Sequence, residues 1–530
     1  MRLPFSTPYL SPGLNPLSDQ FSFLGDTCRL ACRFLSVCCK DREERTRWVT
    51  ISPIPGQTIN GIGVSGAWWP LDLQHFPVSQ QEKVAELLFS KDTGLGLSSY
   101  RYNIGGGGKG VGNPSRRPPT PYVAPGVYNF TADTASNFFL RAAASYGVEQ
   151  LTAFVNSAPA DLTSNGDACG GMMSKENVPA FSKYLADVLV FWQEEGVRFD
   201  LVSPMNEPDN NFANLDGSPC RQEGMAVLPA LRASLPSVLR RTLDAAGLSH
   251  VGILADETST VPEFLPEIPL WLPLAKAHIA AVAHHDYLFA DERSLTAMGV
   301  EGRALSGGKD MWFTEICCFK TREGEREGDP LAPLAFGQTY DPTIVGALQL
   351  GVILYKSFTL VGDTHFDWWT AVSKAIGCSP FNSTTCATTI NRHGYNDGLL
   401  YYDPSFNKTQ NYEIYTTKRF FLLKHFARFI PIGSVRYDVF GSAPLQRVLA
   451  FKRPARGAEP AGWTVVVMNM SDEESAFEIE LYVEMGRATA AYRTTAEEDW
   501  VDVPLQGDRP GEGRFHMLLP GLSITTVLFE

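Results

Sequence analysis

Two glutamates stand where apolar, strand-like runs of the sequence end. Glu207 follows the run at 199–206 in the motif Ser-Pro-Met-Asn-Glu-Pro, and Glu315 closes the run at 311–315. Such positions are poorly suited to a core, because a buried, unpaired carboxylate is costly. Either residue alone could cap a helix or form a surface salt bridge. The two together favour a pair of carboxylates that face one open site.

A pair of carboxylates is what glycoside hydrolysis requires. One must be protonated to donate to the leaving oxygen, and the other must be ionised to attack the anomeric carbon. Asn206, beside Glu207, could donate to a sugar 2-hydroxyl. Arg101 could hold Glu315 ionised, with a loop salt bridge as its alternative role. The pattern therefore predicts a hydrolytic site built on Glu207 and Glu315.

The elements that would position these residues alternate between strands and helices. Because this alternation indicates βαβ units with a parallel sheet, we expect a (β/α)8 TIM barrel, with a doubly wound sheet as the alternative. Active sites of such barrels lie at the carboxyl ends of the strands. The expected strands are 61–65, 98–104, 150–156, 199–206, 250–255, 279–285, 311–315 and 360–366, with helical stretches such as 79–90, 134–147, 180–196 and 228–247 between them.

The pattern changes after a helical stretch near 413–428. Short alternating strands follow, which predict an appended antiparallel β-sandwich side domain at 429–530, with the barrel at 59–428. We expect the strand-like segment 47–58 to pair with the side domain. Residues 1–46 lack an ordinary signal peptide, and we interpret them as a poorly ordered or mis-predicted leader, with a cytosolic tail as the alternative.

Two glycine-rich segments raise the alternative of a nucleotide-dependent enzyme. GIGVSG at 61–66 formally matches a dinucleotide fingerprint, and GGGGKG at 105–110 resembles a phosphate loop. Pro70 would break the helix that the first motif needs. The second has Asn103 in place of the required first glycine, and no Ser or Thr follows Lys109. We expect a first barrel turn and a flexible loop instead.

The motifs together resemble glycoside hydrolase family 30 of clan A, over about residues 48–530. The resemblance is carried by Asn-Glu-Pro after the fourth strand, Glu315 after the seventh, RYNIGGGG after the second and the appended β-domain. GIGVSGAWWPLDL, FVNSAPADLTSNGDACGG and WFTEICC are most similar to its fungal endo-β-1,6-galactanase branch. The resemblance implies a retaining endo-glycosidase with Glu207 as acid/base and Glu315 as covalent nucleophile, acting on β-1,6-linked galactan side chains of plant arabinogalactan.

The resemblance also implies substrate-binding roles for Arg101, Asn156, Asn206 and the segment His285-Asp286-Tyr287 after the sixth strand, in which Tyr287 hydrogen-bonds the nucleophile. It leaves other substrates open, because neighbouring branches cleave xylan, β-1,6-glucan and glucosylceramide. A catalytically silent carbohydrate-binding protein is a further alternative, which the presence of both glutamates disfavours.

Paired tryptophans at the ends of the first and eighth strands suggest sugar platforms. In each pair one ring should stack on a sugar and the other should pack in the core; the pairs are Trp68 with Trp69, and Trp368 with Trp369. His284 and His285 could suggest a metal, but spacing places no third ligand. We expect no metal and no cofactor.

Composition restricts the partners. The 530 residues carry a net charge of −13, which argues against nucleic acid and against anionic membranes. Ile344–Tyr355 is the longest apolar run, and we expect no membrane span because it is short of 18 residues. A monomer acting on a polysaccharide or oligosaccharide is the expectation.

Cysteines and glycosylation sequons favour a secreted, extracellular glycoprotein with disulfide bonds. Cys378 and Cys386 enclose a short loop and should pair. Cys317 and Cys318 directly follow Glu315, and we expect each to pair with a distant cysteine, although the sequence leaves connectivity open. The sequons are Asn129, Asn382, Asn407 and Asn469.

Overall fold

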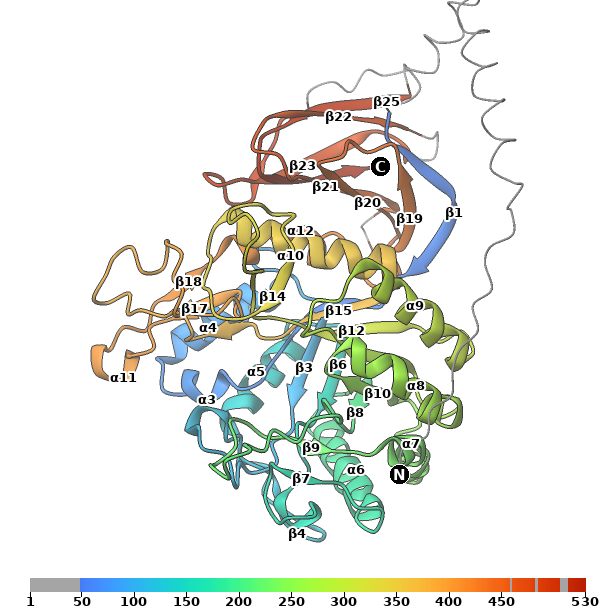
Figure 1. Cartoon of the computed structure of the whole chain (residues 1–530), viewed down its shortest axis with the longest axis vertical. Coiled ribbons are helices and arrows are strands. Elements are labelled where there is room, and N and C mark those ends of the chain that lie inside the picture. The colour runs from blue at the N-terminus through green and yellow to red at the C-terminus, as the bar shows by residue number, and fades with distance from the viewer. Residues whose placement is uncertain (1–47, 458–459, 482–484, 506–512) are drawn as a thin grey trace, which may run out of the picture.

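The computed structural model describes residues 48–457, 460–481, 485–505 and 513–530. Figure 1 shows a barrel surrounded by helices, with an antiparallel β-domain packed against one side of it. The expected leader at 1–46 lies outside the described residues.

The barrel confirms the predicted fold. Within the described residues, eight parallel strands close into a ring, each pairing with the next along the chain. Their residues are nearly all buried, as expected where helices cover the outside and side chains fill the inside. The strands are β2 (Gly61–Ser65), β3 (Ser99–Asn103), β6 (Gln150–Phe154), β8 (Leu201–Ser203), β10 (Gly252–Thr258), β11 (Ala281–His285), β12 (Met311–Glu315) and β15 (His365–Trp368).

The eighth strand begins later than the sequence predicted. Residues 360–366 were expected to be extended, but Ser357–Val361 forms a π-helical turn, η3, that continues the preceding helix. Gly362 ends this turn with φ 74°, a left-handed conformation that glycine adopts at little cost. The strand therefore starts at His365.

A helix follows each barrel strand and covers the outside of the ring. Asp133 and Asp291 cap two of these helices, since their side chains accept hydrogen bonds from the backbone N–H groups of Ser136 and Ser294. The helices are α4 (Val78–Phe89), α5 (Thr134–Ser145), α6 (Val178–Glu194), α7 (Pro229–Ala245), α8 (Val261–Ala275), α9 (Glu292–Ser306), α10 (Ile344–Lys356) and α12 (Lys418–Ala427).

The side domain has two antiparallel layers. The larger sheet has the order β1-β19-β20-β21-β26-β23-β24, and β22 pairs with β25. Apolar side chains from both layers, among them Val465, Phe477 and Phe515, form one core. The strands are β1 (Thr50–Thr58), β19 (Val435–Phe440), β20 (Gln446–Arg453), β21 (Gly462–Asn469), β22 (Ser475–Glu480), β23 (Ala488–Thr494), β24 (Val501–Asp502), β25 (Arg514–Leu519) and β26 (Ser523–Phe529).

The N-terminal strand β1 belongs to this domain rather than to the barrel. It pairs antiparallel with β19, with Ile51 opposite Val439 and Thr58 opposite Val435. In Figure 1 it runs beside β19 along one edge of the domain. The part of the chain that the structure describes thus starts in the side domain with β1, crosses into the barrel at β2 and returns after α12.

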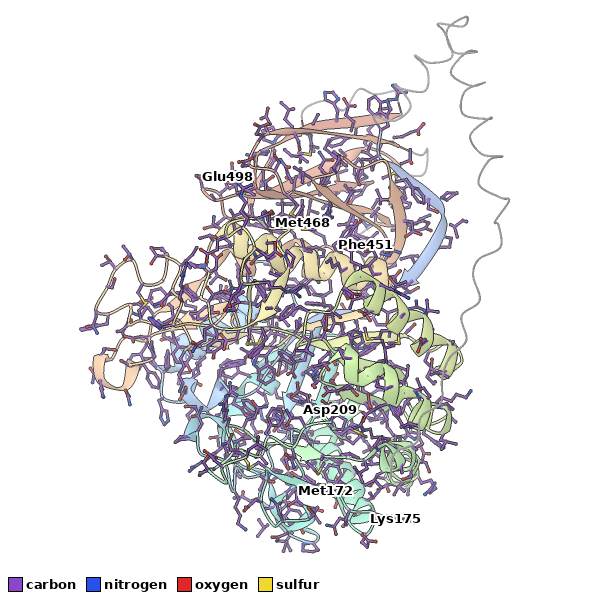
Figure 2. The ribbon with its side chains drawn as sticks, in the orientation of Figure 1. Met172, Lys175, Asp209, Phe451, Met468 and Glu498 are labelled. Carbon is purple, nitrogen blue, oxygen red and sulfur yellow. A yellow bond between two sulfur atoms is a disulfide. The ribbon has the colours of Figure 1, made fainter. Side chains whose placement is uncertain are left out.

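Helices α10 and α12 lie between the barrel and the side domain. Phe451 and Met468 of the side domain join the barrel's hydrophobic core, with the Phe451 ring 5.9 Å from that of Phe358. Both residues are labelled at this junction in Figure 2. One shared core therefore holds the two parts together.

One described segment, Ile344–Val361, is long and apolar enough to cross a membrane by length and composition. The segment exceeds the apolar run Ile344–Tyr355 because η3 lengthens α10 and adds further apolar residues after Lys356. However, 67% of this segment is buried inside the protein, as expected for a core helix.

Disulfides join six of the described cysteines. Cys378 and Cys386 are paired as predicted, and Cys169 pairs with Cys220. Cys317 and Cys318 are bonded to each other, so the expectation of distant partners for them was wrong. Strand β12, which ends at Glu315, is therefore followed after Ile316 by a disulfide between two adjacent cysteines.

Short elements complete the loops above the barrel. They are α3 (Pro70–Leu73), η1 (Pro114–Arg116), β4 (Tyr122–Ala124), β5 (Val127–Tyr128), η2 (Ala160–Leu162), β7 (Gly171–Met172), β9 (Met225–Ala226), β13 (Phe319–Thr321), β14 (Leu334–Phe336), β16 (Val372–Ser373), β17 (Leu400–Tyr402), α11 (Phe406–Thr409) and β18 (Ile414–Thr416).

Candidate active site

Glu207 and Glu315 meet at the carboxyl-terminal mouth of the barrel. Glu315 is the last residue of β12, and Glu207 follows β8. A carboxylate oxygen of each lies within 4.8 Å of one of the other. Both side chains are almost fully buried, at 5% and 3% exposure. The structure therefore brings together the two residues that the sequence singled out.

The turn after β8 aims Glu207 at the mouth. Its backbone is left-handed, with φ 46°, and its N–H donates to the carbonyl of Glu257 at 3.0 Å. A non-glycine residue in this region is uncommon and needs support from its surroundings. Pro208 follows and fixes the chain direction, so Glu207 does not continue the strand.

Donors surround the Glu315 carboxylate. Arg101 Nη1 lies 3.1 Å from Glu315 Oε2, and the Tyr287 hydroxyl donates to Oε1 at 2.7 Å. Burial and the negative charges of Glu315 and Glu207 raise the pKa of Tyr287 well above its usual range, so its hydroxyl keeps its proton. Hydrogen bonds from charged or strongly polar donors stabilise a carboxylate. Glu315 is thus arranged as an anion.

Glu207 has a different environment. Burial raises its pKa, the hydrogen bond from His285 lowers it, and the charge of Glu315 raises it again, to a net value of about 7. His285 Nδ1 lies 3.4 Å from Glu207 Oε1. A carboxyl that keeps its proton to neutral pH can serve as a general acid. The two glutamates therefore differ in the way that acid and nucleophile must.

His285 is held as a cation. Burial opposes its charge, but the charge of Glu315 and hydrogen bonds to Glu207 and Glu257 outweigh burial and raise the pKa of His285 to about 10. Its Nε2 lies 2.9 Å from Glu257 Oε2. Glu207, His285 and Glu315 are close enough to surround a metal ion. A doubly protonated imidazole has no lone pair to offer, so the cluster suits proton transfer better than metal binding.

Two asparagines complete the floor of the site. Asn206 Nδ2 donates to Asn156 Oδ1 at 3.2 Å, and Arg101 Nη2 lies 3.4 Å from Asn206 Oδ1. The Nδ2 of Asn156 is buried and has no hydrogen-bond partner among the described residues. A free buried donor is costly unless a ligand satisfies it. Asn156 is therefore placed to donate to a sugar hydroxyl.

A groove with a volume of about 930 Å³ opens beside the two glutamates. Trp68, Trp69 and Trp369 line it, with the Trp68 and Trp369 rings 5.3 Å apart. Two backbone hydrogen bonds connect the residues of this groove with the catalytic pair. The Trp369 backbone N–H donates to the carbonyl of Ile316, the residue after Glu315, and the Asn210 backbone N–H donates to the carbonyl of Glu207. Aromatic faces along a groove suit stacking on sugar rings.

The four tryptophans have different surroundings. Trp368 is fully buried, and its Nε1 donates to the Asp397 carbonyl at 2.7 Å. Trp369 beside it lines the groove, so one ring of this pair faces the mouth as expected. Trp69 packs against Phe139 at 4.4 Å while one side of it borders the groove, whereas Trp68 lies under the guanidinium of Arg116.

Several residues of the site were not anticipated. Glu257 lies near the end of β10 and contacts both Arg101 and His285, and Thr314 donates to it. Arg116 and Cys318, half of the vicinal disulfide, line the groove. Glu257 carried a usable signal, since it too is an acidic residue at the end of a strand. The other positions had no distinguishing pattern.

The glycine-rich loop after β3 binds the side chain of Glu223. The backbone N–H groups of Gly106 and Gly108 donate to the Glu223 carboxyl at 3.1 and 2.8 Å. Burial outweighs these hydrogen bonds and raises the pKa of Glu223 to about 8. Amides that a phosphate would need are therefore engaged by a side chain, which weighs further against a nucleotide site.

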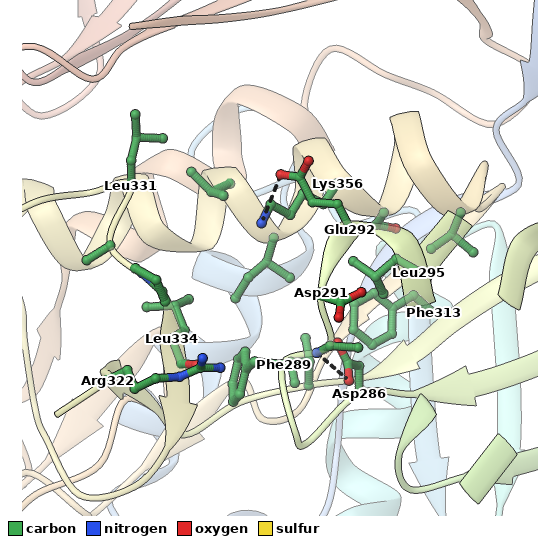
Figure 3. Close-up of a pocket in the computed structure, with 18 of the residues that line it drawn as sticks. Asp286, Phe289, Asp291, Glu292, Leu295, Phe313, Arg322, Leu331, Leu334 and Lys356 are labelled. Carbon is green, nitrogen blue, oxygen red and sulfur yellow. Dashed lines mark hydrogen bonds and ion pairs between the residues drawn. The ribbon is translucent and has the colours of Figure 1, made fainter. Parts of the chain in front are cut away.

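A second cavity of about 300 Å³ lies outside the barrel wall, between α9, α10 and the loop that joins β13 to β14. Figure 3 shows that apolar side chains such as Phe289, Leu295 and Phe313 form most of its wall. Asp286 lines this cavity and accepts from the Ala290 N–H. Asp286 was expected with His285 and Tyr287 at the sugar site, but it faces the opposite side of β11.

The sequence was compared with protein families. Residues 49–260 match the model of O-Glycosyl hydrolase family 30. The matched segment contains Arg101, Asn156, Asn206 and Glu207 and ends shortly after Glu257.

Solved structures with the same fold were also found. A conserved exported protein from Bacteroides fragilis has a TM-score of 0.72 at 20% identity, with 91% of this chain and 100% of that chain covered. The catalytic domain of GH30 xylanase C from Talaromyces cellulolyticus gives 0.67 at 19%, covering 91% and 100%. The endo-β-1,6-glucanase BT3312 gives 0.63 at 15%, covering 91% and 93%.

At these identities the structural likeness shows the fold, a TIM barrel with an antiparallel side domain. Residues 49–260 are thus similar to O-Glycosyl hydrolase family 30, and the chain shares the fold of these solved structures.

Proposed function

We propose that the chain is a retaining endo-glycosidase that hydrolyses β-1,6-linked galactan side chains of plant arabinogalactan. The observation that carries the proposal is the meeting of Glu207 and Glu315 at the barrel mouth, with carboxylate oxygens within 4.8 Å of one another and with Arg101 and Tyr287 on Glu315. Retaining glycosidases have carboxyl separations of about 5–5.5 Å, against about 6.5–9.5 Å for inverting ones. The short separation supports retention.

In the first step, the Glu207 carboxyl gives its proton to the glycosidic oxygen while Glu315 attacks the anomeric carbon. The bond to the leaving sugar breaks, and an ester between Glu315 and the remaining sugar forms. The Tyr287 hydroxyl and Arg101, which hold the two Glu315 oxygens, fix the direction of attack. Asn206 and Asn156 stand where they can bind the sugar's hydroxyls.

In the second step, Glu207 is a carboxylate and acts as the base. It takes a proton from water, which attacks the anomeric carbon and displaces Glu315. Two displacements at one carbon leave the configuration unchanged. Glu207 ends the cycle protonated and Glu315 ends it ionised, so the enzyme returns to its starting state.

The galactan substrate and the endo action are the finer part of the proposal. The sequence motifs most similar to the galactanase branch support the substrate, and the aromatic groove of about 930 Å³ supports binding of an internal stretch of chain. A β-1,6-glucanase, a xylanase or a glucosylceramidase would use the same two glutamates. A silent binding protein would not need the contrast between them.

A digestion panel tests the proposal. Purified enzyme is incubated with β-1,6-galactan, xylan, β-1,6-glucan and glucosylceramide, and the products are resolved by size and linkage. We expect short β-1,6-galacto-oligosaccharides and little product from the rest. Glu315→Gln is the matched control and should bind galactan without cleaving it. Cleavage of another polymer in preference to galactan would contradict the substrate, and full activity of Glu315→Gln would contradict the mechanism.

We further infer that the protein is a secreted, monomeric glycoprotein. The disulfides of the described part require an oxidising compartment to form and persist. Asn129, Asn382 and Asn407 are exposed, whereas Asn469 is fully buried and donates to the Glu473 and Pro520 carbonyls. Mass spectrometry of protein from culture medium should find glycans on the first three and none on Asn469. A glycan on Asn469 or an intracellular protein would contradict this inference.

A further inference from the structure

Glu257 is a fully buried carboxylate directly behind the two candidate catalytic glutamates. It is the second-last residue of β10 and has a left-handed conformation, with φ 67°. Its Oε2 accepts from Arg101 Nη2 at 3.1 Å, from His285 Nε2 at 2.9 Å and from the Thr314 hydroxyl. A strained backbone and three donors on one oxygen indicate a carboxylate whose position is tightly determined.

The two cations that Glu257 binds are the same two that touch the catalytic pair. Arg101 contacts Glu315 with its other terminal nitrogen, at 3.1 Å. His285 contacts Glu207 with its other ring nitrogen, at 3.4 Å. The Glu257 carbonyl also accepts from the Glu207 N–H. One residue is therefore linked to both glutamates, through a different cation in each case.

The charges of this cluster balance only when Glu257 is counted. Arg101 and His285 contribute two positive charges, and Glu257 and Glu315 two negative ones, so Glu207 completes a neutral cluster when it is protonated. The other titratable groups that act on the cluster have partners of their own. Asp209 accepts from Ser259, Asp367 accepts from His365, and Tyr287 donates to Glu315.

We propose that Glu257 is a positioning residue that keeps His285 charged and orients Arg101, so that Glu207 has a permanent donor and Glu315 a fixed partner. Glu257 is fully buried, at 0% exposure, so its side chain is not open to substrate. Its own pKa supports this role, because Arg101 and His285 outweigh its burial and lower that pKa to about 2. The inference rests on the proposed hydrolase for its catalytic meaning, but its main test uses no substrate.

The test is the protonation of His285, followed by the ¹⁵N shifts of its imidazole in protein with labelled histidine. The signal is assigned by its loss in His285→Asn, among nine histidines. We expect wild-type His285 to remain a doubly protonated imidazolium from pH 5 to pH 9. In Glu257→Gln, which keeps the shape and removes the charge, the midpoint should fall by about 1–3 pH units.

The matched control is Asp256→Asn. Asp256 is the neighbouring residue, is equally buried and forms an ion pair with Arg232 at 3.0 Å, away from the site. It should leave the His285 titration unchanged. Should Glu257→Gln fail to fold, Thr314→Val removes one donor to Glu257 and should move the midpoint in the same direction by a smaller amount.

A second readout separates positioning from a structural role. On whichever substrate the digestion panel identifies, Glu257→Gln should lower kcat by about 10- to 100-fold and leave KM within about twofold. A neutral His285 in the wild type at pH 7, or an unshifted titration in Glu257→Gln, would overturn the proposal whatever the substrate proves to be. Failure of the digestion panel alone would overturn the function and leave the His285 result standing.

Discussion

The protonation of Glu207 gives a quantitative prediction about stability. Its pKa is raised from an ordinary value of 4.5 to about 7 in the folded protein, chiefly by burial. Between these values the unfolded chain has released the proton and the folded chain has kept it. Folding stability must then fall as pH rises, by about 1.4 kcal/mol per pH unit from this group alone.

Glu207→Gln removes this titration and keeps the shape of the side chain. Over the 2.5 units between 4.5 and 7, the variant should gain about 3 kcal/mol relative to wild type. His285 adds a fall in stability of its own above about pH 6, because its pKa is raised from 6.5 to about 10 in the folded protein, but wild type and variant share this contribution and it does not enter their difference. The difference should be constant below about pH 3.5 and constant again above about pH 8, one unit beyond the two pKa values.

The assay is urea unfolding of both proteins at several pH values, followed by tryptophan fluorescence. The same titration should appear in wild-type kcat/KM, which should fall tenfold per pH unit above about pH 7 as the acid is lost. Glu223→Gln is a useful comparison, since burial raises the pKa of Glu223 to about 8 at a site away from the catalytic pair. Glu223→Gln should change the pH dependence of stability, whereas the fall in kcat/KM should still begin near pH 7. A stability difference between Glu207→Gln and wild type that does not vary with pH would refute the acid assignment.

Three further substitutions test the site and its frame. Tyr287→Phe removes the 2.7 Å hydrogen bond to Glu315. In steady-state kinetics it should lower kcat/KM by about 10- to 150-fold, the loss expected for a hydrogen bond to a charged group. An unchanged kcat/KM would exclude this role. Trp369→Leu keeps an apolar filling without a ring face, and KM for oligosaccharides should rise by about 2- to 12-fold, whereas an effect on kcat alone would argue against stacking. Gly63→Ala would place a Cβ 2.3 Å from Asp367 Oδ1 and 2.5 Å from the Ser99 carbonyl, and should destabilise the barrel by about 1–3 kcal/mol in thermal unfolding; wild-type stability would show that β2 and β3 can separate there.

The strands were predictable because each is a short apolar run closed by a turn. The runs at 61–65 and 311–315 match β2 and β12 to the residue. Glu207 and Glu315 could be paired in advance for the same reason, since the barrel topology brings all strand ends to one rim. The start of the eighth strand was predicted too early, at residue 360. Apolar residues suit helices as well as strands, and the residues up to Val361 continue the preceding helix as η3.

The rest of the site depends on contacts between distant parts of the chain. Glu257 meets Arg101 across 156 positions and His285 across 28, so its role is visible only once β3, β10 and β11 lie side by side. The sequence could not show which of Trp68, Trp69 and Trp368 would face the groove and which would be buried. The orientation of each ring is set by contacts with distant loops, such as the loop that carries Arg116. The bond between Cys317 and Cys318 was missed because neighbouring cysteines were expected to find separate partners.

The central claim is that Glu315 attacks the sugar and carries it as an ester while Glu207 supplies and recovers a proton. A 2-deoxy-2-fluoro glycoside with a good leaving group, made from the sugar that the digestion panel identifies, should trap this ester, because the fluorine slows its hydrolysis more than its formation. Peptide mapping by mass spectrometry should place one sugar on Glu315 in the wild type and none in Glu315→Gln. A label on another residue, or turnover without a label and with inverted product in the first minutes of an NMR time course, would contradict the account.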